Sequence, residues 1–176
     1  RGVSIAGTGA LGDISLTNVS VTDSLSDGIA IDLAAGSSVN SVTIDGQGTA
    51  SVQNSNGNGI LVSMLGTPVA GDITISNYLI ENSTAGDGIN LTLDNVISGN
   101  IVMDANTVNA SSGDGIALIL DGVTGNDVST TNSNIDGSGA IGINLSAVGA
   151  TLGNVLLDPS SVSNSQEDGV LLNFTD

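Results

Sequence analysis

The sequence predicts an all-β solenoid, in which one chain coils through about six stacked rungs of 26–31 residues with three short parallel strands in each rung. Three observations predict this fold. A glycine returns at a nearly constant interval, apolar residues alternate with other residues at the two-residue period of a β-strand, and a serine holds a fixed place in every rung. The repeated glycines are Gly28, Gly59, Gly88, Gly115, Gly142 and Gly169.

The apolar residues place the three strands of each rung in order. The first strand has two of them, at Ile14 and Leu16, Val42 and Ile44, Ile73 and Ile75, Ile101 and Met103, and Val155 and Leu157, whereas Val128 is followed by Thr130 in the fifth rung. The second strand has one, at Val21, Val52, Ile80, Val108, Ile135 and Val162, and the second rung has extra residues around Gly48 before it. The third strand opens directly after the glycine, at Ile29, Ile60, Ile89, Ile116, Ile143 and Val170. We expect equivalent strands of successive rungs to pair about 4.8 Å apart.

A serine follows the second strand in all six rungs, at Ser24, Ser55, Ser83, Ser111, Ser138 and Ser165. The residue before it is usually Asn or Asp, as at Asp23, Asn54 and Asn82. We interpret the pair as a corner, in which the side chains hydrogen-bond to local backbone and tolerate turn dihedrals. The alternative is a repetitive binding face.

Composition excludes several classes of partner. One Lys or Arg residue stands against 18 Asp and Glu residues, so the formal net charge is −17. Nucleic acids and anionic membranes are bound by clusters of Lys and Arg, and we therefore expect neither nucleic-acid binding nor membrane insertion. The mean hydropathy of +0.32 argues against disorder. The absence of cysteine fits a secreted bacterial protein and a cytosolic one equally, whereas the scarcity of basic residues favours an extracellular or cell-surface location.

The sequence contains no convincing catalytic constellation. It has no His and no Lys, and Arg1 stands at the end of the chain. Stacked aspartates could lie about 5 Å apart, as retaining glycosidases require, but every stacked pair meets that criterion equally. Tyr78 is the only candidate for an aromatic platform of the kind that sugar sites use. We therefore expect no enzyme activity, no catalytic residues and no required cofactor.

Calcium is the sharpest binding hypothesis. Asp27, Asn58, Asp87, Asp114 and Asp168 occupy one repeated position, and Asp13, Ser41, Asp72, Asn100, Asp127 and Asn154 occupy another. Columns of carboxylate and carbonyl oxygens suit a hard cation. Asp87 and Asp114 are the candidate calcium pair, because both lie in the sequence G-D-G-I. The alternative is a solvated turn aspartate before a glycine at positive φ.

Two segments carry a family resemblance, N-Y-L-I-E-N-S-T-A-G-D-G-I-N-L at 77–91 and N-T-V-N-A-S-S-G-D-G-I-A-L at 106–118. They resemble the parallel β-helix repeat of pectate-lyase-like solenoids, and the likeness extends over essentially the whole chain. It implies a right-handed, single-stranded coil. That group includes polysaccharide lyases and hydrolases, phage tailspikes and the passenger segments of bacterial surface adhesins and autotransporters, and the composition here is most similar to the adhesins.

The resemblance leads us to expect a non-catalytic structural or adhesive segment, the stalk or interaction surface of a large bacterial surface protein. The alternative is a polysaccharide-binding or polysaccharide-degrading β-helix domain, a lyase, a hydrolase or a tailspike-like protein. We expect residues 1–176 to form a single segment, an internal fragment of a longer repeat array. The expected partners are the chain itself, through end-to-end stacking or continuation, and glycans or proteins of a host surface or matrix.

Overall fold

The computed structural model describes residues 1–66, 71–159 and 161–176, and it confirms the predicted all-β solenoid. The described part contains nineteen strands in three parallel sheets and no helix, so none of its elements is a helix able to span a membrane. The seven-stranded sheet contains β1 (Val3–Gly7), β4 (Ile29–Leu33), β7 (Ile60–Leu65), β10 (Ile89–Asp94), β13 (Ile116–Asp121), β16 (Ile143–Val148) and β19 (Val170–Thr175).

The other two sheets have six strands each. The first contains β2 (Asp13–Thr17), β5 (Ser41–Asp45), β8 (Ile73–Ser76), β11 (Ile101–Asp104), β14 (Val128–Thr131) and β17 (Val155–Asp158). The second contains the shortest strands, β3 (Val21–Thr22), β6 (Ser51–Gln53), β9 (Leu79–Glu81), β12 (Thr107–Asn109), β15 (Asn134–Asp136) and β18 (Ser161–Ser163).

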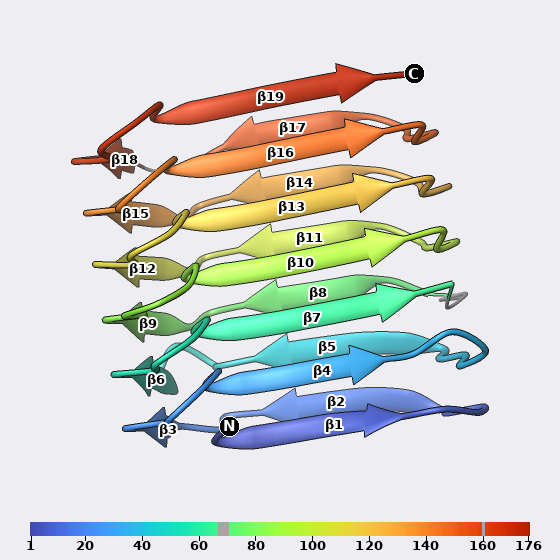
Figure 1. Cartoon of the computed structure of the whole chain (residues 1–176), viewed down its shortest axis with the longest axis horizontal. Helices are drawn as coiled ribbons and strands as arrows, with labels where there is room; N and C mark the ends of the chain where they lie inside the picture. The colour runs from blue at the N-terminus through green and yellow to red at the C-terminus, as the bar shows by residue number, and fades with distance from the viewer. Residues whose placement is uncertain (67–70, 160) are drawn as a thin grey trace.

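The chain visits the three sheets in turn. In Figure 1 it runs from left to right along the near face, returns along the far face, turns back through a short strand and rises with each circuit, so the coil is right-handed. Each strand pairs in parallel with the same strand of the next rung, without slippage. Ile89 of β10 therefore lies between Ile60 and Ile116. This register confirms the predicted alignment of the repeats.

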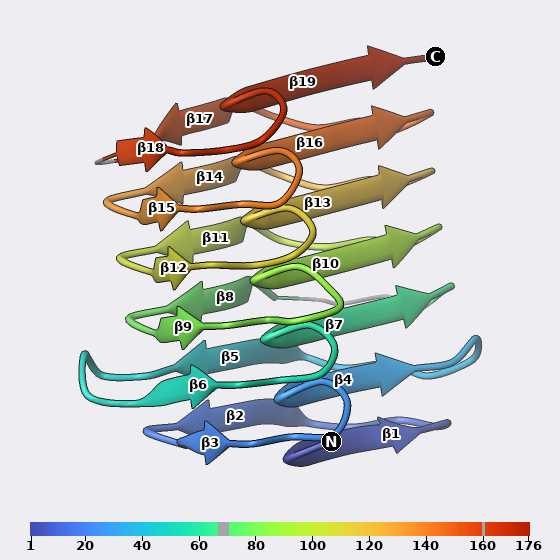
Figure 2. The same ribbon diagram turned by 60° about the vertical axis from the view of Figure 1, so that its left-hand side comes forward.

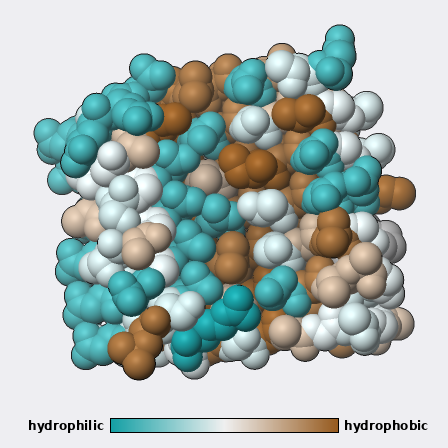
Figure 3. Space-filling view, in the orientation of Figure 1, coloured by the Kyte–Doolittle hydropathy of each residue, from teal (hydrophilic) through white to brown (hydrophobic). Residues whose placement is uncertain are grey.

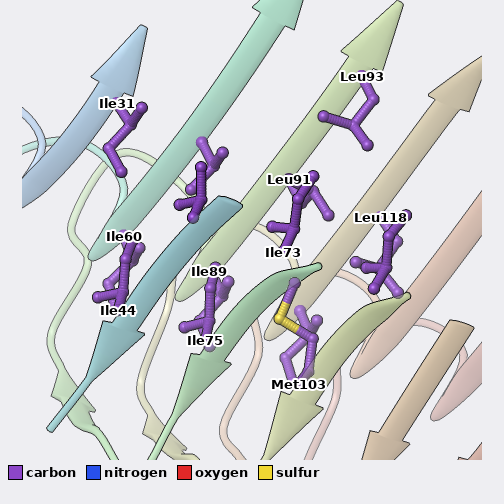
Figure 4. Close-up of a cluster of buried hydrophobic side chains, with 14 of the residues drawn as sticks. Ile31, Ile44, Ile60, Ile73, Ile75, Ile89, Leu91, Leu93, Met103 and Leu118 are labelled. Carbon is purple, nitrogen blue, oxygen red and sulfur yellow. The ribbon is translucent and has the colours of Figure 1, made fainter. Parts of the chain in front are cut away.

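The core is a set of stacked aliphatic columns. In β10 the side chains of Ile89, Leu91 and Leu93 are buried and alternate with partly exposed polar residues, as a strand with one buried face requires. Figure 4 shows the columns of two sheets facing each other, with Ile60 pointing toward Ile44 and Ile89 toward Ile75. Because most inward positions carry Ile, Leu, Val or Met, the narrow interior is filled almost without aromatic rings.

Each rung bends at corners where one residue adopts the left-handed conformation. Asparagine is the commonest residue at the positive-φ positions that flank the short strand, with Asn18, Asn77 and Asn132 before it, and Asn54 and Asn82 after it. Asparagine tolerates this region better than most L-residues. A third corner follows the long strands, at Gly66, Asn95, Gly122 and Gly149. The prediction that the residue before the repeated serine tolerates turn dihedrals is therefore confirmed.

The repeated glycines serve a different purpose from the predicted one. The expectation of a positive φ is wrong, because none of the six belongs to the positive-φ glycines of the described chain. A Cβ at Gly28 would instead lie 2.7 Å from the carbonyl oxygen of Gly59 and would collide with Val52, both on the next rung. Glycine is required here because successive turns approach each other too closely for any side chain.

The second rung is wider than the others. The β5–β6 connection stands out from the coil in Figure 2, and Gln47, Gly48 and Thr49 are exposed there. Tyr78 of the next rung lies buried behind this corner, and its hydroxyl donates a hydrogen bond to the carbonyl oxygen of Val19 at 3.0 Å. Tyr78 thus connects the rungs on either side of the insertion.

The outer face of the seven-stranded sheet carries no uniform stripe. Figure 3 shows polar and apolar side chains interspersed over these strands. One outward column runs through Ala30, Leu61, Asn90, Ala117, Asn144 and Leu171. Such a surface offers no repeated pattern of ligand-binding groups.

Candidate functional site

The column that contains the candidate calcium pair is assembled as the sequence predicts. Because Ile89 pairs with Ile116, the residues two positions earlier, Asp87 and Asp114, lie on adjacent rungs. Asp27 and Asn58 continue the column toward the N-terminus. Ile141 occupies the place above Asp114 and interrupts it.

The acidic side chains of this column bind the main chain of the following rung. Asp87 Oδ1 accepts a hydrogen bond from the backbone N–H of Asp114 at 2.7 Å, and Asp114 Oδ1 accepts one from the N–H of Ile141 at 3.0 Å. Asn58 Oδ1 does the same for the N–H of Asp87 at 2.8 Å. Carboxylates form stronger hydrogen bonds than neutral acceptors. The column therefore fastens each rung to the next.

The second carboxylate oxygens are occupied as well. Asn90 Nδ2 donates to Asp87 Oδ2 at 2.7 Å, and Asn144 Nδ2 donates to Asp114 Oδ2 at 2.8 Å. Burial raises the pKa of Asp87 above its usual value, against the opposing effect of its hydrogen bonds from Asn90 and the Asp114 N–H. The alternative prediction of a solvated turn aspartate is wrong. Asp27 is only 7% exposed, and Asp87 and Asp114 are half-buried, because the next rung covers them.

Calcium binding by Asp87 and Asp114 stays a prediction. Among the described residues no group of three or more His, Cys, Asp or Glu side chains is arranged to hold a metal ion. A cation shared by this pair would have to compete with the amide donors that both carboxylates already bind.

In the second predicted column, aspartate side chains accept hydrogen bonds from the asparagine of the following rung. Asp127 Oδ1 accepts from both the N–H and Nδ2 of Asn154, at 2.7 and 3.2 Å. Asp72 Oδ1 binds the two equivalent groups of Asn100, at 2.8 and 3.1 Å. An ionised carboxylate can only accept, so a donor side chain above it is favourable. The alternation of Asp and Asn follows from this requirement.

A third arrangement escaped the sequence analysis. Asp104 Oδ1 accepts hydrogen bonds from Thr131 Oγ1 at 2.7 Å and Asn132 Nδ2 at 2.8 Å, and these hold the pKa of Asp104 below its usual range. Asp45 and Asp136 meet a Ser-Asn pair on the next rung in the same way, and their pKa values are lowered for the same reason. The sequence pattern that could have predicted this arrangement is an Asp at the end of a strand, with Ser or Thr and then Asn at the equivalent place one repeat later.

The repeated serines lie inside the corners. Only Ser24 has the predicted local hydrogen bond, from Oγ to the carbonyl oxygen of Asp27 at 2.6 Å. The prediction fails for the hydroxyls of the other five, which are enclosed and have no partner among the described residues: Ser55, Ser83, Ser111, Ser138 and Ser165. They face the preceding rung, where a Cβ on Gly28 would lie 2.8 Å from Ser55 Oγ. A small side chain fits there, and the enclosed hydroxyls are unavailable to a ligand.

A surface hollow with a volume of about 580 Å³ lies over β11, β14 and β17. Its lining combines amide, carboxylate and aliphatic groups, contributed by Asn100, Val102, Asp127, Val128, Ser129, Asn154, Val155 and Leu156. Leu156 is 52% exposed. Sequence reasoning recognised the Asp and Asn of this surface but not the hollow, because the outward residues of this sheet show no constant residue type.

The aromatic platform considered from the sequence is absent at Tyr78. That side chain is buried, and burial raises the pKa of its hydroxyl.

No family model matches the chain, and searches of curated proteins and of solved structures gave no match. The fold is therefore established by the strand register alone.

Proposed function

We propose that this chain is a non-catalytic structural coil, the stalk or interaction surface of a large extracellular bacterial protein of the adhesin type. The observation that supports this proposal best is that the acidic columns bind successive rungs to each other. Their oxygens bind the backbone of the next rung, at 2.7 Å for Asp87 and 3.0 Å for Asp114. These carboxylates hold the coil together and do not converge on a common space for a substrate.

Catalysis would require a free acid or base within hydrogen-bonding reach of a substrate. Both oxygens of Asp87 and of Asp114 already accept hydrogen bonds from amide groups. A substrate proton would have to displace an amide donor that fastens two rungs together. This cost argues against catalysis at the stacked pairs.

A continuous coil suits a rigid spacer. The backbone hydrogen bonds between strands run along the coil axis, and the aliphatic columns extend through every rung. At the final rung Val170, Leu172 and Phe174 occupy inward columns but remain 44–55% exposed. These apolar side chains would be covered by a further rung of the same protein or by a second copy. No cofactor is needed for such a role.

The second candidate is polysaccharide binding or degradation, and the hollow over β11, β14 and β17 favours it. Its volume of about 580 Å³ and its combination of Asp127, two asparagines and Leu156 would suit a sugar chain better than the densely paired columns would. Glycans of a host surface or matrix are then the expected ligands. This function places binding on the outside of one sheet and leaves the structural columns unchanged.

One experiment separates the two candidates. The chain is incubated with acidic and neutral polysaccharides, and new reducing ends, unsaturated products and retardation in affinity electrophoresis are measured. Absence of turnover and retardation supports the structural coil, whereas turnover overturns it. Retardation that Leu156→Ala in the hollow weakens, and that Leu25→Ala at an exposed corner leaves unchanged, supports the polysaccharide-binding alternative.

A sedimentation experiment tests self-association separately. If the open end binds a second copy, the chain associates as its concentration rises, and Phe174→Asp weakens the association. Leu25→Asp, which adds the same charge at a residue 89% exposed on a corner, serves as the matched control. Equal effects of the two variants would contradict docking at the end of the coil.

A further inference from the structure

The chain contains nine Asp-Gly or Asn-Gly dipeptides, the sequences most prone to spontaneous succinimide formation. In this reaction the glycine main-chain nitrogen attacks the side-chain carbonyl carbon of the preceding residue, and glycine offers no side chain to hinder it. The nine end at Gly28, Gly46, Gly57, Gly59, Gly88, Gly115, Gly122, Gly137 and Gly169. Most of them stand at the corners of the coil.

The fold restrains the attacking nitrogen in seven of these dipeptides. Each of the seven glycine N–H groups donates to a carbonyl oxygen of the next rung at 2.8–3.1 Å: Gly28, Gly46, Gly59, Gly88, Gly115, Gly122 and Gly137. A nitrogen held in this way cannot lose its proton and turn toward its neighbour's side chain without local opening of the ladder. Of these nine glycines, all of which lie in the described part of the chain, only Gly57 and Gly169 lack such a bond.

The two exceptions differ in chemistry. Gly169 follows Asp168, and an aspartate side chain forms a succinimide more slowly than an asparagine amide does. Gly57 follows Asn56, whose amide can lose ammonia. Asn56 is exposed, and its Oδ1 accepts a hydrogen bond from Thr84 Oγ1 at 3.2 Å, which draws electron density from the carbonyl carbon.

Asn58, only two residues later, provides an internal comparison. Its Nδ2 donates to Asp27 Oδ1 at 3.2 Å, its Oδ1 accepts from the N–H of Asp87 at 2.8 Å, and the N–H of Gly59 is bound at 3.0 Å. Both groups that must move for cyclisation are therefore fixed. The same dipeptide therefore occurs twice in one rung, once with no main-chain hydrogen bond on its glycine N–H and once with that N–H and the asparagine amide nitrogen both held.

We propose that Asn56 is a site of spontaneous deamidation in the folded chain and that Asn58 is protected by the coil. The bond from Gly57 N to Asn56 Cγ forms as the bond from Cγ to the amide nitrogen breaks, and ammonia leaves. Water then opens the succinimide at one of its two carbonyls and yields aspartate or isoaspartate. Water is the only co-reactant, and the reaction involves no oxidation or reduction.

The isoaspartate product would disturb the neighbouring rung. It inserts one extra carbon into the main chain before Gly57, a residue that already lies against Asp27. A Cβ on Gly57 would lie 2.8 Å from Asp27 Oδ1 and 2.9 Å from Asp27 N. We therefore expect the modification to weaken the contact between Asp27 and Asn58 and to loosen this corner.

The test ages the whole chain at mildly alkaline pH, folded in buffer or unfolded in urea. Peptide mapping locates the mass gain of deamidation, and isoaspartyl methyltransferase labelling detects isoaspartate. In the folded chain we expect Asn56 to react about ten- to a hundred-fold faster than Asn58, because Asn58 must first break several hydrogen bonds. In urea the two rates should converge.

The control variant is Asn56→Gln, whose longer side chain disfavours the five-membered ring. It should remove the isoaspartate signal of the folded chain without changing the melting temperature. Equal rates at Asn56 and Asn58 in the folded chain would overturn the proposal. So would a folded chain in which neither reacts while both react in urea, since Asn56 would then be protected too.

Discussion

Replacing Gly115 with alanine should destabilise the coil, whereas the same change at Gly169 should not. A Cβ at Gly115 would lie 2.5 Å from the carbonyl oxygen of Gly142 and 2.8 Å from Ser138 Oγ, and it would also collide with Ile135. The carbonyl belongs to the next rung, so it can retreat only if the two turns separate. At Gly169 the nearest atom to the new Cβ would be Val162 Cγ1, at 3.8 Å, which is ordinary contact.

The two substitutions should therefore differ in their effect on the free energy of unfolding. Overpacking of this kind costs about 1–3 kcal/mol of unfolding free energy. Replacement of glycine by alanine without strain stabilises by about 0.4–1 kcal/mol, because the unfolded chain loses freedom. Gly115→Ala should lose about 1–2 kcal/mol net, and Gly169→Ala should be neutral or slightly stabilised. For a chain of this size each kcal/mol corresponds to about 2–4 °C in the melting temperature.

Thermal and urea unfolding followed by circular dichroism would measure both effects. The two glycines occupy the same repeated position, and neither has a positive φ. They differ in that Gly115 lies against a further rung and Gly169 does not, so the comparison measures the effect of that rung. Equal losses in the two variants would refute close approach as the reason for the repeated glycine.

The remaining predictions concern the acidic columns. Asp87→Ala leaves the Asp114 N–H without its acceptor and should lower the free energy of unfolding in urea by about 1–3 kcal/mol. Asp87→Asn keeps an acceptor oxygen and should cost less. Equal losses in the two variants would contradict the contact between Asp87 and the backbone. The lowered pKa of Asp104 stabilises the fold above about pH 4, and this contribution is lost as the pH falls through the folded-state pKa. Asp87 has the opposite sign, because its raised pKa means that ionisation opposes folding at neutral pH and that acid relieves this cost. As the pH is lowered, the melting temperature should therefore fall less for Asp104→Asn than for the unchanged chain. An equal fall in both would contradict the stabilising role of ionised Asp104. If Asp87 and Asp114 bind calcium, calcium should raise the melting temperature relative to a chelator, and Asp114→Asn should reduce the rise; no rise would exclude this pair.

The period of the sequence was sufficient to predict the fold because every rung repeats the same three strands. The function of the repeated glycine was not predictable in the same way. A left-handed turn and a close approach between turns both select glycine, and only the three-dimensional structure distinguishes the two causes. The left-handed residue lies five positions before Gly59, at Asn54, while Gly59 itself lies against the next rung.

The candidate site was predictable as a set of columns but not as a set of contacts. The sequence places Asp87 beneath Asp114, and the structure does the same. What the sequence could not reveal is that the partner of Asp87 is a backbone N–H, because main-chain donors are common to every residue. The hollow beside Leu156 was missed for a related reason, since its shape arises from side chains of three different rungs.

The wide corner between β5 and β6 indicates where this scaffold can be enlarged. Three exposed residues, Gln47, Gly48 and Thr49, leave the coil there, and Ala50 returns to a buried position before β6 begins. The strand pairs on both sides keep their register despite the detour. A foreign peptide grafted between Gln47 and Thr49 would therefore be displayed on the outside of the rod, and the same corner in other rungs offers a row of attachment points spaced about 4.8 Å apart.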